Sequence, residues 1–231
     1  MAKPLLLGHR GARNYAPENT IEAFEQALAD GCDGFEFDVR LTADQIAVVC
    51  HDPTYRRLAL SRSSYAKLQE KSPDLCTLES VLTGFRNRAF LNVELKVAGA
   101  EELLIELLRE HPAKKGLIVS SFLPSIVLRL HELGASFPLG IICENRRQLA
   151  RWKELPVQAV MVERGLVTRK LVDEMRTTPF KPTQGLNGAP DAPRQIFIWT
   201  VNSARDMKKF AAMGVDGIIS DDTKLLAKTL G

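Results

Sequence analysis

Residues 34–40 carry the sequence Gly-Phe-Glu-Phe-Asp-Val-Arg, in which acidic and apolar side chains alternate. Successive side chains of a β-strand point to opposite faces, so Glu36 and Asp38 share one face while the apolar residues take the other. Residues 92–96, Asn-Val-Glu-Leu-Lys, repeat this alternation and place Glu94 between two polar neighbours on one face. Both runs therefore predict strands with a polar inner face and an apolar face packed against helices.

Short aliphatic runs of the same kind recur along the chain. They alternate with segments in which apolar residues recur at helical spacing, such as Ile21, Phe24 and Leu28, where Asn19 is expected to cap the helix. Alternating strands and helices predict a parallel sheet with helices outside it. The expected strands are residues 5–9, 34–40, 89–97, 117–120, 139–143, 159–163, 195–201 and 215–220.

Eight strand-helix units in a chain of 231 residues predict a closed barrel, which typically takes roughly 250 residues. We therefore expect residues 1–231 to form a single α/β domain, a TIM (β/α)8 barrel with a short insertion after the second strand. An open doubly wound sheet is the structural alternative. The first expected strand is not followed by a Gly-x-Gly-x-x-Gly loop, which favours the barrel.

Two segments interrupt the alternation. Residues 53–77, the expected insertion, show few helix or strand signals and carry an excess of basic residues. Over the C-terminal face of the barrel they would attract an anionic substrate, whereas the alternative is an ordinary solvated loop face. Residues 178–193 contain four prolines and two glycines and predict a long loop before the seventh strand.

The composition is that of a globular protein, with 45% hydrophobic and 26% charged residues. A net charge of +3 is far from the basic excess of a nucleic-acid-binding protein, so no nucleic-acid partner is expected. Four cysteines without a Cys-x-x-Cys pair suit a reducing, cytoplasmic compartment. We expect neither a signal peptide nor a membrane span, because the apolar runs are too short. A homodimer is one of the oligomeric states that the sequence leaves open.

The carboxylates of the two quoted runs predict a cation site at the strand ends. Glu36, Asp38 and Glu94 would repel one another if they were buried without partners. Oxygen ligands without a cysteine or histidine cluster suit a hard divalent cation, Mg²⁺ or Ca²⁺, rather than Zn²⁺. The alternative is a network of ion pairs in which Lys96 neutralises Glu94 and either Arg40 or Arg10 neutralises the other acids.

Two of the four histidines lie where expected strands end, which is where catalytic groups of a barrel are found. His9 ends the first expected strand, and His51 follows the aliphatic run 46–50. Near neutral pH, one imidazole can accept a proton while another donates one, which suits reaction at a phosphate. Arg10 offers a planar fork for the phosphate, and Trp199 ends the seventh expected strand, where an indole can line an apolar wall.

Seven short motifs in a fixed order resemble the glycerophosphodiester phosphodiesterase family, and they span nearly the whole chain. The motifs are His-Arg-Gly at 9–11, Pro-Glu-Asn-Thr at 17–20, Phe-Glu-Phe-Asp-Val at 35–39, His-Asp at 51–52, Glu-Leu-Lys at 94–96, Trp-Thr-Val-Asn at 199–202 and Gly-Val-Asp-Gly-Ile-Ile at 214–219. The resemblance implies a TIM barrel with a small insertion after the second strand.

The same resemblance implies a metal site, an acid-base pair and a substrate pocket. The implied metal ligands are Glu36, Asp38 and Glu94. The implied proton acceptor and donor are His9 and His51. The implied contacts to the substrate are Arg10, Lys96 and Trp199.

The implied activity is metal-dependent hydrolysis of a glycerophosphodiester to sn-glycerol 3-phosphate and an alcohol. Two alternatives are a lysophospholipase D, which would need an apolar trough, and a non-catalytic barrel that binds phosphodiesters, which would have no use for an acid-base pair. Residues 53–60 depart from the Arg-Thr-Thr-Asn-Gly-like stretch of the family, so the alcohol is left open. The attacking oxygen, from water or from the 2-hydroxyl group of the substrate, is left open as well.

Overall fold

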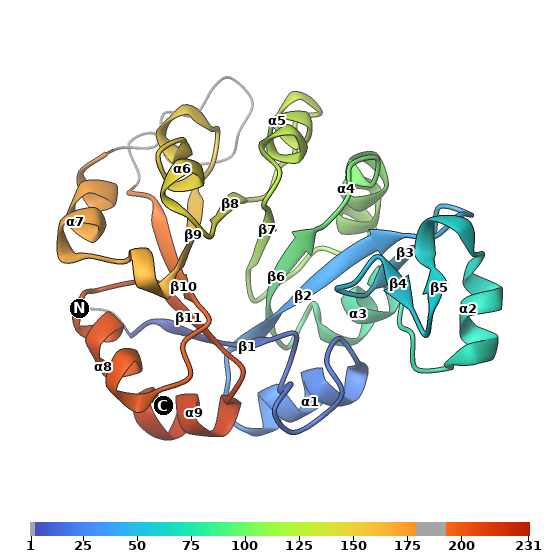
Figure 1. Cartoon of the computed structure of the whole chain (residues 1–231), viewed down its shortest axis with the longest axis horizontal. Coiled ribbons are helices and arrows are strands. Elements are labelled where there is room, and N and C mark those ends of the chain that lie inside the picture. The colour runs from blue at the N-terminus through green and yellow to red at the C-terminus, as the bar shows by residue number, and fades with distance from the viewer. Residues whose placement is uncertain (1–2, 179–192) are drawn as a thin grey trace.

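A computed structural model describes residues 3–178 and 193–231 of the chain. Eight parallel strands form a closed barrel with helices around its outside (Figure 1). Strand β1 (Leu5–His9) pairs with both β2 (Gly34–Leu41) and β11 (Gly217–Ser220), which closes the sheet. The predicted TIM barrel is therefore confirmed, and the open doubly wound alternative is excluded.

All eight expected strands are present close to their predicted bounds. The strands between β2 and β11 are β6 (Phe90–Leu95), β7 (Leu117–Ser121), β8 (Leu139–Cys143), β9 (Ala159–Glu163) and β10 (Gln195–Trp199). The helices that follow the barrel strands are α1 (Ile21–Ala29), α3 (Leu78–Phe85), α4 (Glu101–Glu110), α5 (Pro124–Glu132), α6 (Arg146–Leu149), α7 (Arg169–Thr177), α8 (Ala204–Ala212) and α9 (Thr223–Leu230). Short 3-10 turns at Trp152–Glu154 and Arg164–Leu166 flank β9.

The apolar face of β2 packs outward against the helices, as its alternating sequence predicts. Phe35 and Phe37 are completely buried, and the ring of Phe35 stacks on that of Phe24 with a centroid distance of 4.2 Å. Phe85 contacts both Phe24 and Phe35 edge-on, which joins α1, β2 and α3 in one aromatic cluster. At Gly34, a Cβ atom would lie 1.9 Å from the carbonyl oxygen of Phe90, so β2 and β6 can approach only without a side chain there.

The cap of α1 differs from the prediction by one residue. Thr20, not Asn19, caps the helix, because its hydroxyl accepts a hydrogen bond from the backbone N–H of Ala23 at 3.2 Å. Asn19 adopts a left-handed backbone with φ 60°, a conformation that asparagine tolerates better than most residues. Its side chain donates a hydrogen bond to Asp38 instead, so Asn19 is part of the polar interior of the barrel.

The insertion after the second barrel strand has more regular structure than the sequence indicates. It follows β3 (Ala47–Val49), which is antiparallel to β2, and contains a small hairpin and a helix. The later elements are β4 (Thr54–Tyr55), β5 (Leu58–Ala59), a 3-10 turn at Leu60–Arg62 and α2 (Tyr65–Lys71). The expectation of few helices or strands was wrong because Ser64 caps α2, and Leu68 packs with Val48 and Leu60 in a separate small core.

The insertion lies at the edge of the molecule beside β3 (Figure 1). None of its residues 53–77 is among those that line the central pocket described below. Its basic side chains therefore do not form the wall of that pocket.

Three other expectations concern the loop, the membrane and the cysteines. Residues 179–192, which cover most of the expected proline-rich loop, lie outside the described residues. Within residues 3–178 and 193–231, no helix has the length and apolar character needed to cross a membrane. All four cysteines are buried as free thiols.

Candidate active site

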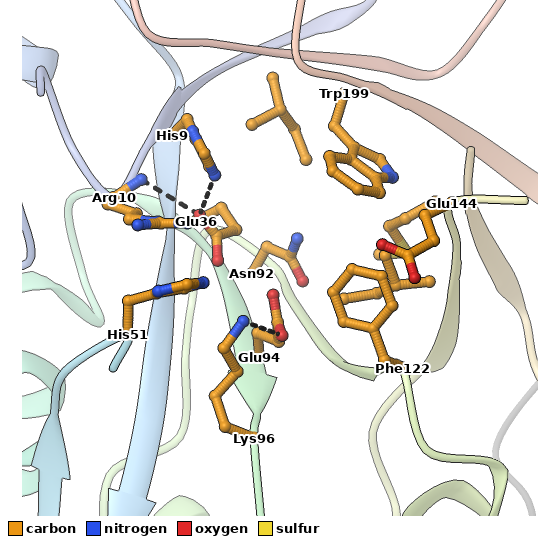
Figure 2. Close-up of a pocket in the computed structure, with 13 residues that line it drawn as sticks. His9, Arg10, Glu36, His51, Asn92, Glu94, Lys96, Phe122, Glu144 and Trp199 are labelled. Atoms are coloured by element: carbon orange, nitrogen blue, oxygen red, sulfur yellow. Dashed lines mark hydrogen bonds and ion pairs between the residues drawn. The ribbon is translucent and has the colours of Figure 1, made fainter. Parts of the chain in front are cut away.

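The C-terminal ends of the barrel strands surround a pocket of about 270 Å³ that has two chemically distinct halves (Figure 2). We call them the polar half and the apolar half. The polar half is lined by His9, Arg10, Glu36, His51, Asn92, Glu94 and Lys96. The apolar half is lined by Phe122, Ile142, Met161, Trp199 and Ile219, with Glu144 beside them.

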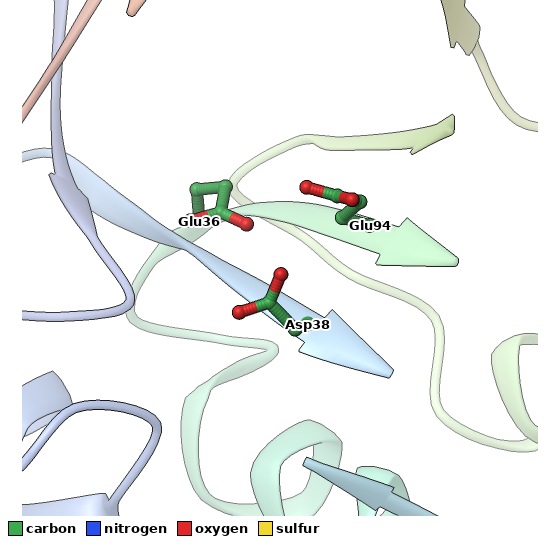
Figure 3. Close-up of side chains that lie close together, drawn as sticks. All are labelled: Glu36, Asp38 and Glu94. Carbon is green, nitrogen blue, oxygen red and sulfur yellow. The ribbon is translucent and has the colours of Figure 1, made fainter. Parts of the chain in front are cut away.

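Three carboxylates converge beneath the polar half (Figure 3). The register of β2 and β6 places Asp38 opposite Glu94 and Glu36 opposite Asn92. Glu36, Asp38 and Glu94 are buried, and each offers an oxygen atom within 4.8 Å of the others. The convergence predicted from the alternating sequence is therefore present.

Asp38 is the best-neutralised carboxylate of the three. Its Oδ1 lies 3.1 Å from Lys96 Nζ, and its Oδ2 lies 3.3 Å from Arg10 Nε and accepts a hydrogen bond from Asn19 Nδ2 at 2.8 Å. Burial alone would raise the pKa of Asp38, but Lys96 and Arg10 outweigh it and hold this pKa below its usual value. Asp38 is therefore an anion at neutral pH.

Glu36 and Glu94 are less well compensated. Glu94 Oε1 lies 2.6 Å from Lys96 Nζ, yet burial and the charge of Asp38 raise the pKa of Glu94 to about 7. Glu36 Oε2 accepts a hydrogen bond from the backbone N–H of Arg10 at 3.1 Å, whereas its buried Oε1 has no hydrogen-bond partner. Burial, followed by repulsion from Asp38 and Glu94, raises the pKa of Glu36 well above its usual value.

The ion-pair alternative accounts for these acids only in part. Arg10 and Lys96 bring two positive charges to three carboxylates, and Glu36 keeps one buried oxygen without a partner. An all-oxygen donor set of this kind fits a hard divalent cation, which would remove both the repulsion and the missing partner. The side chains present therefore fit the predicted cation site.

His9 is held by a carboxylate that the sequence analysis did not single out. Its Nδ1 lies 2.6 Å from Asp221 Oδ1, and its Nε2 faces Glu36 Oε2 at 3.9 Å. Asp221 also accepts a hydrogen bond from Asn202 Nδ2 at 2.6 Å. Burial would raise the pKa of Asp221, but His9 and Asn202 lower it overall, so Asp221 is an anion. An anion at this position accepts a hydrogen bond from Nδ1–H of His9, which leaves the Nε2 lone pair toward the pocket.

His51 reaches the polar half from the loop after β3. Arg40 Nε donates a hydrogen bond to the backbone oxygen of His51 at 2.7 Å, which anchors this loop to β2. The imidazole Nδ1 lies 2.8 Å from Asp52 Oδ1. Burial lowers the pKa of His51, an effect that Asp52 and Asp38 oppose without cancelling it.

Trp199 lines the apolar half at the end of β10, as predicted. Its ring lies edge-on to that of Phe122 with a centroid distance of 5.6 Å (Figure 2). Lys96 Nζ lies 5.5 Å from the centroid of Phe122, so this aromatic ring connects the two halves of the pocket. Arg10 and Lys96 both line the pocket at the positions that the sequence predicts.

Sequence reasoning missed five polar, charged or aromatic residues that line the pocket or hold its side chains, apart from the aliphatic part of its lining. Three of them come directly after barrel strands. Their position at a strand end could have indicated a place in the pocket, but they belong to none of the motifs quoted above. The missed residues are Phe122, Glu144, Asn202, Asp221 and, in a different role from the expected cap, Asn19.

A TIM barrel whose strand ends gather three carboxylates, two cationic side chains and two histidines around one pocket defines a class of phosphate-ester hydrolase. Comparison with known proteins specifies the family. A family model described as the glycerophosphoryl diester phosphodiesterase family matches residues 9–225. The chain belongs to this family.

Curated relatives agree with this assignment, and a solved structure has the same fold. YhdW of Bacillus subtilis (strain 168) is 31% identical over 250 residues, which cover 96% of each chain. The glycerophosphodiester phosphodiesterase of Caldanaerobacter subterraneus subsp. tengcongensis is 28% identical and covers 97% of this chain and 96% of its own. The crystal structure of a glycerophosphodiester phosphodiesterase from Thermotoga maritima has a TM-score of 0.82 at 24% identity and covers 99% of both chains.

Proposed function

We propose that this protein hydrolyses glycerophosphodiesters to sn-glycerol 3-phosphate and an alcohol. Membership of the family and the names of its relatives support this activity. A structural neighbour, an Oleispira antarctica phosphodiesterase with a TM-score of 0.79 at 22% identity over 98% of this chain and 96% of its own, was solved in complex with the product sn-glycerol-3-phosphate. The observation that carries the proposal is the convergence of acids, cations and histidines on one pocket.

Glu36, Asp38 and Glu94 would hold one divalent cation, Mg²⁺ or Ca²⁺. Their oxygen atoms lie within 4.8 Å of one another, and the unpartnered Oε1 of Glu36 provides a free ligand. When bound, such a cation supplies positive charge that offsets the negative charge developing on the phosphate oxygens. Arg10 and Lys96 stand at the same carboxylates and would bind the phosphate from the polar half.

The two histidines would move the protons of the reaction. His9, whose Nδ1 is hydrogen-bonded to Asp221, presents the lone pair of Nε2 and would accept the proton of the attacking oxygen. His51 would donate a proton to the oxygen of the leaving alcohol. An anionic phosphate bound beside His51 favours its charged form, which counteracts the effect of burial on its pKa. Each turnover thus leaves one proton on His9 and takes one from His51, and exchange with solvent restores both.

One observation favours lysophospholipase D activity as a second candidate. A second pocket of about 320 Å³ shares Phe122 and Ile142 with the central pocket. Its lining adds the apolar residues Pro124, Ile141 and Leu155 and the polar residues Asn145, Arg147, Gln148 and Arg151. An acyl chain would lie along the apolar side of this pocket. Turnover of lysophosphatidylcholine equal to that of glycerophosphocholine would support this candidate.

The direct test is a panel of glycerophosphodiesters assayed before and after EDTA treatment, with Mg²⁺ or Ca²⁺ added back. We expect release of sn-glycerol 3-phosphate that EDTA abolishes and one of the two cations restores. His9→Asn and His51→Ala should lose activity, whereas His111→Ala, a change outside the pocket, should retain it. Full activity of the two pocket variants would refute the roles assigned to the histidines, whereas a wild type that binds the diesters without turning them over would indicate the non-catalytic barrel. Detection of a cyclic glycerol phosphate by ³¹P NMR during turnover would indicate attack by the 2-hydroxyl group, whereas its absence would indicate direct attack by water.

Three expectations about the whole protein stay predictions. We expect a cytoplasmic location, with which the four buried free thiols agree. We also expect one domain over residues 1–231 and include a homodimer among the expected states. Cell fractionation, limited proteolysis and light scattering test these three points in turn.

A further inference from the structure

The apolar half of the pocket contains one charged side chain, Glu144, which the proposed chemistry does not use. We propose that Glu144 selects substrates whose leaving alcohol carries a positive charge, such as a quaternary ammonium alcohol. This inference rests on the proposed hydrolysis of glycerophosphodiesters and specifies which of them the site prefers.

Glu144 directly follows β8 and is exposed at the mouth of the pocket. Its backbone N–H donates a hydrogen bond to Gln148 Oε1 at 2.9 Å, which ties this position to the first turn of α6. Among the hydrogen bonds and ion pairs of the described part of the chain, none uses the carboxylate of Glu144. The carboxylate is therefore free to bind a ligand, and its backbone is anchored.

The surroundings of this carboxylate are aromatic and aliphatic. Figure 2 shows Glu144 on the same side of the pocket as Trp199 and Phe122, opposite the side chains of the polar half. Phe122 already has the ammonium group of Lys96 near its ring, at 5.5 Å from the centroid, so the indole of Trp199 is the aromatic group left for a ligand. An aromatic face beside a carboxylate is the environment that favours an alkylated ammonium group, because it combines cation–π attraction with charge pairing.

The two arms of the substrate differ in the partners that they require. The glycerol arm carries hydroxyl groups, and the polar half offers them Asn92 Nδ2, a buried donor without a hydrogen-bond partner in the described part of the chain. The apolar half has two polar groups without partners among the described residues, the buried donor Trp199 Nε1 and the exposed carboxylate of Glu144, and its other side chains are aliphatic or aromatic. With the phosphate at Arg10 and Lys96, we place the glycerol arm in the polar half, and the leaving alcohol extends along Trp199 toward Glu144.

The test compares two substrates of the same shape and different charge. These are glycerophosphocholine and the glycerophosphodiester of 3,3-dimethylbutanol, in which a carbon atom replaces the ammonium nitrogen. We expect Glu144→Gln to lower kcat/KM for glycerophosphocholine by roughly threefold to fivefold, mainly through KM, because it removes an exposed ion pair of that size and leaves the cation–π contact with Trp199 in place. For the neutral substrate, the change should stay below about twofold on the same grounds.

Glu106→Gln is the matched control. Glu106 is an exposed residue of α4, outside the pocket, and its substitution removes the same charge from the protein. This variant should treat both substrates as the wild type does. An unequal effect of Glu144→Gln with an unchanged Glu106→Gln supports the proposal.

An equal loss on both substrates would overturn the inference, since it would mean that Glu144 holds Trp199 or binds a group common to both. No loss on either substrate would overturn it as well. Both outcomes leave the proposed function intact, because the wild type still turns over the two diesters. If the wild-type enzyme hydrolyses neither diester, with Mg²⁺ or with Ca²⁺, the proposed function is refuted. The substrate selection assigned to Glu144 is then refuted as well.

Discussion

The substitution Asp221→Asn replaces one carboxylate oxygen beside His9 by an amide NH₂ group. The orientation of the new amide is set by Asn202, whose Oδ1 accepts hydrogen bonds from the backbone N–H of Asp221 and from Ser220 Oγ. Asn202 Nδ2 must therefore donate to residue 221, as it does to Asp221 Oδ2 at 2.6 Å. In Asp221→Asn, the amide oxygen keeps this bond and the amide NH₂ group faces His9 Nδ1. That nitrogen must then accept a hydrogen bond, and the imidazole proton moves to Nε2.

The consequence is an imidazole without a lone pair toward the pocket. A hydrogen bond to a charged partner contributes about 1.5–3 kcal/mol, and its loss corresponds to a decrease of roughly 10- to 150-fold in kcat. We expect the upper part of this range, because both His9 and Asp221 are largely buried, with 15% and 20% of their side chains exposed. The change of tautomer adds to the loss of the bond.

The assay is kcat on glycerophosphocholine, together with ¹⁵N NMR of the imidazole nitrogens. The spectrum should show the proton on Nδ1 in the wild type and on Nε2 in the variant. Asp222→Asn is the matched control, since Asp222 caps α9 and asparagine caps a helix equally well. A variant at Asp221 that keeps wild-type kcat, or one that loses activity with the proton still on Nδ1, would refute the role assigned to this pair.

Three further predictions concern stability and accessibility. A divalent cation at about 100 times its Kd should stabilise the fold by about 2.7 kcal/mol and raise Tm by roughly 5–11 °C, and Glu36→Gln should abolish this shift in a thermal scan. Burial raises the pKa of Cys32 and Cys143 to about 12, so little thiolate is present at pH 8. Because all four cysteines are buried, we expect iodoacetamide to modify none of them until guanidinium unfolds the protein. An alkylated thiol in the mass spectrum of the native protein would contradict this prediction. Phe35→Ala should cost about 3–5 kcal/mol in denaturant titrations because it empties the centre of the aromatic cluster, and a cost below about 1 kcal/mol would mean that the cluster closes over the gap.

The local sequence was sufficient to predict most of the barrel strands and the acidic residues of the barrel interior. Alternation in residues 34–40 and 92–96 was sufficient to place Glu36, Asp38 and Glu94 on inner faces, because the period of a strand is a local property. Local patterns did not predict the elements of the insertion. Its helix α2 is too short to show a clear apolar period and depends on packing against Val48 and Leu60. Local patterns also missed the cap of α1 by one residue, since Asn19 and Thr20 are both good capping residues.

By itself, the sequence determined the type and order of the elements, the inner faces of β2 and β6, and the two histidines at strand ends, because each depends on residues that are near one another in the chain. Only the tertiary structure decided which partners those side chains meet. Asp221 reaches His9 because β11 pairs with β1 at the closure of the barrel, although 212 positions separate the two residues in the sequence. Glu144 and Trp199 line the same side of the pocket because the ends of β8 and β10 both face it. Closing the sheet into a ring brings together strand ends that no local pattern connects, and this is the physical reason why the partners could not be predicted from the sequence.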